Sequence, residues 1–216
     1  MSPIRIDIWS DFICPFCYMG EALLQQALQD YDADQVTIQY HSYQLMPDLP
    51  TDTAMNSTEL LVTHKGMPRE QAEAANAQVT ERAASVGLDY QLEQSIVTNT
   101  RTAHRLTHYA AEHGRQHRLV RRLFAAHFTE GSHVGDADTL ADLAAEAGLD
   151  RDAAHAVVVG DHYSADVDAD IAQAQQIGVS GVPFFVFNQR LALSGAQPVE
   201  AFQQALQQAQ EQPVAQ

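Results

Sequence analysis

Strand-forming residues occur only near the two ends of this chain, and that distribution limits the folds open to it. Apolar and polar residues alternate over 4–9 and 36–43, which is the period of a half-buried strand. Two short strand-type runs return at 183–187 and 190–193, joined by a turn at Asn188-Gln189. Residues 55–178 show no convincing strand, so one sheet must be assembled from distant parts of the chain.

The segments between the strands have helical spacing. A helix predicted over 15–31 joins the first two strands into a βαβ unit, whose strands should be parallel. Gly and Asp residues at expected helix ends, such as Gly148 and Asp136, divide the central part. We expect helices at 56–65, 68–87, 92–113, 116–129, 137–147, 150–159, 163–177 and 198–210. The pattern predicts an α/β domain, 1–50 with 160–216, interrupted by an all-helical insertion, 51–159.

The charge balance argues against two classes of partner. The chain carries 12 basic and 28 acidic residues, a formal net charge of −16. Nucleic acid and anionic membranes both attract a basic face, so we expect neither as a partner. No apolar run approaches the roughly 18 residues of a membrane-spanning helix, and the N-terminus lacks the apolar core of a secretory signal. We therefore expect a cytoplasmic protein, either a monomer or a homodimer.

The two cysteines lie three positions apart, where the first strand meets the first helix. Cys14 precedes Pro15, a residue suited to a first helical turn, and Cys17 follows one turn later. A helix N-terminus stabilises a thiolate, which is the reactive form of cysteine. The position predicts Cys14 as the more exposed attacking thiol and Cys17 as the shielded resolving thiol. Pro15 stiffens the turn, and Phe16 offers no side-chain donor to the sulfur.

Other readings of the cysteine pair remain open at this point. Zinc needs about four ligands, and no suitably spaced histidine pair supplies the missing two, so we expect no metal. A buried, inert pair is the other alternative.

Val182-Pro183 opens the third strand, and the sequence does not decide between its cis and trans isomers; spacing alone favours an ordinary trans proline.

The segment 8–20 (Ile-Trp-Ser-Asp-Phe-Ile-Cys-Pro-Phe-Cys-Tyr-Met-Gly) resembles the active-site segment of DsbA-like thioredoxin-fold oxidoreductases. Residues 178–187 resemble the cis-proline segment of that family. Residues 193–197 and 99–105 resemble two further segments of its cytoplasmic FrnE-like branch. The resemblance covers nearly the whole chain, in the same order.

The resemblance implies a thioredoxin fold with a helical insertion, and thiol–disulfide exchange at Cys14 and Cys17. It also implies a cis Val182-Pro183 bond facing the cysteines. Substrates would be proteins or small thiols and disulfides, with no cofactor beyond the redox-active pair and with glutathione as a candidate co-substrate. The superfamily also contains 2-hydroxychromene-2-carboxylate isomerases and kappa-class glutathione transferases. The alternative function is therefore a glutathione-dependent isomerase or transferase acting on a small aromatic or polyketide substrate.

Several other side chains are candidates for substrate binding or for tuning the thiols. Asp11 would raise the pKa of a nearby thiol, although capping the loop or facing water is the simpler expectation. The direction of exchange, the substrate and the recycling partner stay open. The candidate substrate-binding residues are Trp9, Asn99, His104, Gly195 and Gln197.

Overall fold

The computed structural model describes residues 4–211, and this part of the chain divides into two compact units. One unit holds the residues up to Leu45 together with those from Val167 onward, and the other holds Met46–Asp166. The sequence pattern predicts boundaries at 50/51 and 159/160. Within residues 4–211, no helix combines the length and the apolar character needed to cross a membrane.

The first unit contains a mixed four-stranded sheet in the order β2-β1-β3-β4. β1 runs parallel to β2, as the βαβ pattern predicts, and antiparallel to β3, which pairs antiparallel with β4. The elements of this unit are β1 (Ile4–Ser10), α1 (Pro15–Ala27), the 3₁₀ helix η1 (Ala33–Gln35), β2 (Val36–Ser42), β3 (Phe184–Phe187), β4 (Leu191–Ser194) and α9 (Val199–Glu211). The four strands predicted from the sequence are confirmed.

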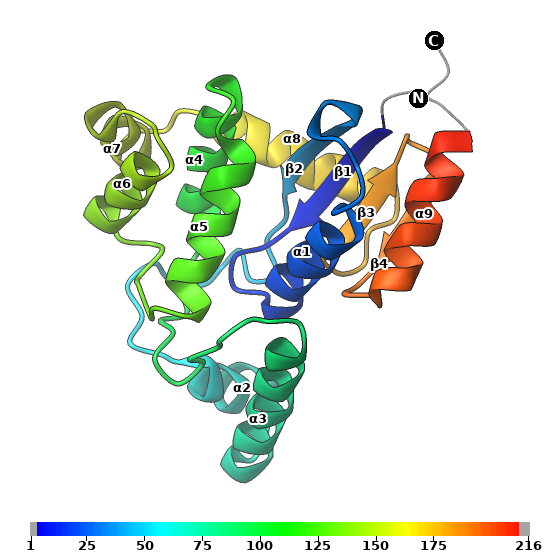
Figure 1. Ribbon diagram of the computed structural model, residues 1–216. Helices are drawn as coiled ribbons and strands as arrows, with labels where there is room; N and C mark the ends of the chain where they lie inside the picture. The colour runs from blue at the N-terminus through cyan, green and yellow to red at the C-terminus, as the bar shows by residue number, and fades with distance from the viewer. Residues whose placement is uncertain (1–3, 212–216) are drawn as a thin grey trace. The chain divides into compact units, whose positions relative to one another are not determined.

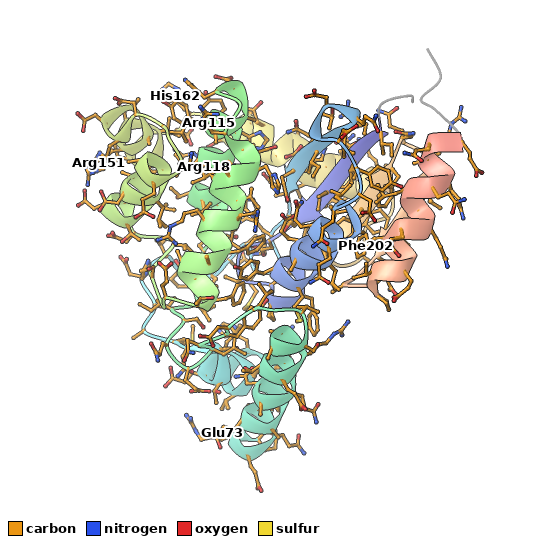
Figure 2. The ribbon with its side chains drawn as sticks, in the orientation of Figure 1. Glu73, Arg115, Arg118, Arg151, His162 and Phe202 are labelled. Atoms are coloured by element: carbon orange, nitrogen blue, oxygen red, sulfur yellow. The ribbon has the colours of Figure 1, made fainter. Side chains whose placement is uncertain are left out.

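Helices cover both faces of this sheet (Figure 1). On one face, Phe185 of β3 meets Phe202 of α9 edge to face, with ring centroids 4.9 Å apart; Figure 2 shows Phe202 on the side of α9 toward the sheet. Ile8 is paired with Phe185 in register and points to the same face. On the other face, Trp9 packs with Ala174 of α8 (Ser164–Gln176).

The second unit is helical throughout its regular structure. It contains α2 (Ser57–Lys65), α3 (Arg69–Ser85), α4 (Arg101–Glu112), α5 (Gln116–Phe128), α6 (Ala137–Glu146), α7 (Arg151–Val159) and the first residues of α8. The predicted N-cap is confirmed at Asp136, whose side chain accepts a hydrogen bond from the N–H of Thr139.

The helix predicted over 92–113 is wrong in its first part, because α4 begins only at Arg101. Backbone groups before it pair with other segments: the N–H of Val97 donates to the carbonyl of Met55, and that of Asn99 to Pro50. These tertiary hydrogen bonds replace the i to i−4 bonds that a helix would have supplied. The helical spacing of 92–100 therefore reflects burial in an irregular segment.

Candidate active site

The turn between β1 and α1 places both cysteines at the start of the helix. The N–H of Cys14 donates to the carbonyl of Asp11 at 3.1 Å, which closes the turn. Cys14 is the N-cap of α1, Pro15 is its first residue, and the N–H of Cys17 donates to the carbonyl of Cys14 at 3.0 Å. Both sulfurs therefore lie at the positive end of the helix dipole.

Cys14 and Cys17 are both free thiols. Their exposure hardly distinguishes them, since Cys14 is 4% exposed and Cys17 is 2% exposed. Burial raises the pKa of Cys17 well above its ordinary value, and the hydrogen bond and charge of Cys14 raise it further. Cys17 therefore resists ionisation.

Two groups at the end of β1 oppose that effect. The backbone N–H of Asp11 and the hydroxyl of Ser10 both hydrogen-bond to the sulfur of Cys17 and lower its pKa in part. Ser10 was not among the residues singled out in the sequence. The only signal was its position as the last residue of a strand that leads into the cysteine turn.

Asp11 stabilises the turn between β1 and α1 from its buried side. Its carboxylate is fully buried and accepts the backbone N–H of Leu45 at 2.7 Å. The carbonyl of Ser10 accepts the N–H of Tyr43 at 3.1 Å. Asp11 therefore fixes the loop after β2 against the cysteine turn. Of the two alternatives expected for it, capping and facing water, the second is wrong, because the carboxylate is buried and caps a backbone N–H.

The Val182-Pro183 peptide bond is cis, as the resemblance implied. The thiol of Cys14 donates to the carbonyl of Val182, with Sγ and O 3.5 Å apart. The N–H of Gly195, whose φ of 82° favours glycine, donates to the carbonyl of Pro183 at 2.8 Å. The structure thus brings together Cys14, Val182, Pro183 and Gly195.

The remaining candidates take other positions. Phe16 is 36% exposed at the middle of the motif. Trp9 is buried on the α8 face and offers almost no surface to a substrate. The side-chain amide of Gln197 is exposed and donates to the carbonyl of Ser194.

The two candidates of the helical unit are held within that unit. The amide of Asn99 donates to the carbonyls of Pro47 and Leu49 and accepts the N–H of Arg101. His104 is buried in α4. These contacts give Asn99 a role in fixing the 47–49 loop.

A buried ionic cluster on the α8 face was missed by the sequence analysis. The ring of His41 lies between Asp170, 2.7 Å from Nδ1, and Asp7, 2.9 Å from Nε2. Asp7 also pairs with Arg5 at 2.8 Å. An aspartate between Ile6 and Ile8 in a buried strand was the available signal, since such a charge requires a partner. Among residues 4–211, no group of three or more His, Cys, Asp or Glu side chains has the arrangement of a metal site.

Comparison with known proteins agrees with this geometry. A probable DsbA oxidoreductase, SCO1869 from Streptomyces coelicolor, has a solved structure that superposes with a TM-score of 0.91 at 36% identity, covering 99% of this chain and 92% of that one. A curated relative, the uncharacterized protein YwbO of Bacillus subtilis (strain 168), is 25% identical over 207 residues, which are 94% of this chain and 96% of that protein.

The fold is also shared with proteins of another described activity. The structure of a 2-hydroxychromene-2-carboxylate isomerase superposes with a TM-score of 0.74 at 18% identity, covering 96% of this chain and 97% of that one. At this identity the likeness concerns the fold alone. The model of the DSBA-like thioredoxin domain matches residues 5–207, nearly the whole chain. The chain therefore belongs to the DSBA-like thioredoxin family, which confirms the resemblance found in its sequence.

Proposed function

We propose that this protein is a thiol–disulfide oxidoreductase that works through the Cys14–Cys17 pair. The observation that carries the proposal is the position of Cys14, a free thiol at the N-cap position of α1 whose sulfur lies 3.5 Å from the carbonyl oxygen of Val182. Membership of the DSBA-like thioredoxin family supports the same class of reaction. Family members of this kind act on thiol or disulfide substrates.

The proposed exchange has two steps and moves two electrons. The Cys14 thiolate attacks a substrate disulfide, forms a mixed disulfide and releases one substrate thiolate. Cys17 then loses its proton and attacks the sulfur of Cys14, which breaks the mixed disulfide and releases the second substrate thiolate. The substrate is reduced to a dithiol while the pair becomes a disulfide, and the reverse sequence oxidises a dithiol substrate.

The raised pKa of Cys17 suits it to the second step. While Cys17 stays protonated, Cys14 is the thiol available for the first attack, since only thiolates attack efficiently. Once Cys14 is consumed in a mixed disulfide, its contribution to the pKa of Cys17 disappears, and the contacts from Ser10 and Asp11 remain. Cys17 is then better able to ionise and to resolve the intermediate.

The residues around the pair complete the proposed site. Pro15 fixes the first turn of α1, Phe16 presents an apolar surface, and the carbonyl of Val182, the residue before Pro183, lies beside the sulfur of Cys14. We propose that the protein is cytoplasmic and acts on proteins or on small thiols and disulfides, with glutathione as a candidate co-substrate and with no bound cofactor.

Two single substitutions test the proposal with a peptide disulfide as substrate. Cys14→Ser should abolish exchange, and Cys17→Ser should stop turnover but still form a stable mixed disulfide that mass spectrometry detects. The second variant is the control for folding of the first. Exchange that survives in Cys14→Ser would overturn the proposal, and glutathione-dependent isomerisation by that variant would favour the alternative function.

A further inference from the structure

The charged side chains Arg5, Asp7, His41 and Asp170, called here the ion cluster, lie between the sheet and α8. Asp7 comes from β1, His41 from β2 and Asp170 from α8. Both ring nitrogens of His41 contact carboxylate oxygens, and the side chains of His41 and Asp170 are each 11% exposed. Arg5 reaches Asp7 from the solvent side, where its own side chain is 47% exposed.

This geometry fixes the protonation state of His41. An ionised carboxylate only accepts hydrogen bonds, and a neutral imidazole has only one N–H. When both carboxylates are ionised, their positions on opposite nitrogens require the doubly protonated, positively charged ring. Burial alone would lower the pKa of His41, but the hydrogen bonds and charges of Asp170 and Asp7 outweigh it and raise the pKa to about 9. Two cations and two anions then balance within the ion cluster.

The ion cluster holds α8 to the ends of β1 and β2. The second carboxylate oxygen of Asp170 accepts the backbone N–H of Ser42 at 2.7 Å. The indole N–H of Trp9 donates to the backbone carbonyl of the same aspartate at 3.2 Å. One residue of α8 thus binds two strands through three separate groups.

Trp9 links the ion cluster to the segment that faces Cys14. Its ring stacks on His41 with centroids 4.5 Å apart and 15° between planes, a geometry in which a cation is attracted to the indole face. The rings of Trp9 and of Phe184, the residue after Pro183, are arranged edge to face with their centroids 6.5 Å apart. Val179 and Val182 pack in the same apolar cluster as Trp9, and Val179 is tied to the end of α8 by a hydrogen bond to Ala174.

We propose that protonated His41 is a positioning residue for disulfide exchange, which clamps α8 and Trp9 against the Val182-Pro183 segment and so fixes the backbone that a substrate meets beside Cys14. The proposal rests on the proposed function, because it concerns the same site. In this proposal His41 acts through Trp9 and α8, which it contacts, and not on either sulfur. Loss of the clamp should therefore weaken substrate binding more than it changes the chemistry of the thiol.

The clamp has a defined pH range. The pKa of His41 is raised, so its stabilisation is complete below the ordinary value of 6.5 and is lost as the pH rises through about 9. Burial would raise the pKa of Asp7, but His41 and Arg5 outweigh it and lower the pKa below 3.8. The contribution of Asp7 is therefore complete above pH 3.8 and is lost only in stronger acid. The ion cluster should be intact across the whole neutral range.

The first test uses Trp9, the single tryptophan of the chain, as the probe. A stacked imidazolium quenches indole fluorescence, so emission of the wild-type protein should rise with a midpoint near pH 9 as His41 loses its proton. His41→Gln should lose this transition, and the matched control His155→Gln, at a half-buried position of α7 outside the ion cluster, should keep it. A midpoint near 6.5, or a transition that persists in His41→Gln, would overturn the proposed protonation state. The wild-type titration tests the protonation state of His41 by itself, so this test stays decisive even if His41→Gln folds poorly.

The second test separates positioning from general damage. At neutral pH, His41→Gln should show a several-fold higher KM for a peptide disulfide, with the rate of Cys14 toward 5,5′-dithiobis(2-nitrobenzoic acid) unchanged, since that small reagent needs no docked backbone. An unchanged KM, or an equal loss with both reagents, would overturn the positioning role. If the wild-type protein exchanged neither reagent, the proposed function itself would fail, whereas the fluorescence midpoint would still report the ion cluster.

Discussion

The sulfur of Cys17 is surrounded by groups that act on its charge in opposite directions. Burial and the neighbouring Cys14 raise its pKa, whereas the N–H of Asp11 and the hydroxyl of Ser10 lower it. Burial is the largest of these influences, and the hydrogen bonds from Asp11 and Ser10 offset part of it. Ser10 is the one side chain of this set that can be changed without touching a cysteine or the turn.

Replacing Ser10 by Ala should slow the resolution of a mixed disulfide on Cys14. Loss of a hydrogen bond to a thiolate corresponds to about one pKa unit or more, so the rate at neutral pH should fall on the order of tenfold. Stopped-flow measurement of resolution against pH should show the profile of the variant shifted to higher pH. Ser42→Ala is the matched control, since Ser42 is paired with Ser10 in register and is also buried. Equal profiles for Ser10→Ala and the wild type would contradict this role.

At the scale of elements, the contact of α1 with β3 determines how closely Pro183 approaches the cysteine helix. Gly20 of α1 lies against Pro183 and Phe185: an added Cβ would be 2.9 Å from the proline ring and 3.0 Å from the phenylalanine ring. Neither ring can easily move aside, because the ring of Pro183 is joined to its own backbone nitrogen and the ring of Phe185 packs on Phe202. Glycine is required here by the close approach rather than by its backbone angles.

Gly20→Ala should therefore destabilise the protein although alanine favours helices. The gain in helix propensity is at most about 1 kcal/mol, and overpacking typically costs about 1–3 kcal/mol. Chemical denaturation should show a net loss of stability of roughly 1 kcal/mol or more. Gly181→Ala serves as the control, because an added Cβ there meets nothing within 4 Å. A Gly20→Ala variant as stable as the wild type would contradict this prediction, because the rings of Pro183 and Phe185 would then have shifted to accept the methyl group.

The same elements show which features of the structure can be predicted from the sequence. The strands, the cysteine turn and the cap at Asp136 follow local rules of period and turn chemistry, and the structure contains them. The start of α4 does not follow such rules, because tertiary hydrogen bonds from Val97 and Asn99 override the helical spacing. The ion cluster needs His41 and Asp170, which are 129 positions apart, and no local pattern pairs them.

At the scale of the whole molecule, the proposed site forms because β3, late in the sequence, pairs with β1 in the same sheet. Cys14 and Val182 are 168 positions apart, and the helical unit lies between them in the sequence. The family resemblance supplied this long-range pairing, which spacing alone left open. All residues proposed to react or to line Cys14 belong to the unit that carries the sheet.

Redox titration of the intact protein in glutathione buffers tests the central claim most directly. Cys14 and Cys17 should interconvert between two thiols and one disulfide in a single two-electron transition, followed by the mass of alkylated peptides. Because Phe16 offers no donor to the thiolate, the midpoint should lie between about −180 mV, as in disulfide isomerase, and about −270 mV, as in thioredoxin. A pair that never forms the disulfide, or that accumulates only a glutathione adduct on Cys14, would contradict the account.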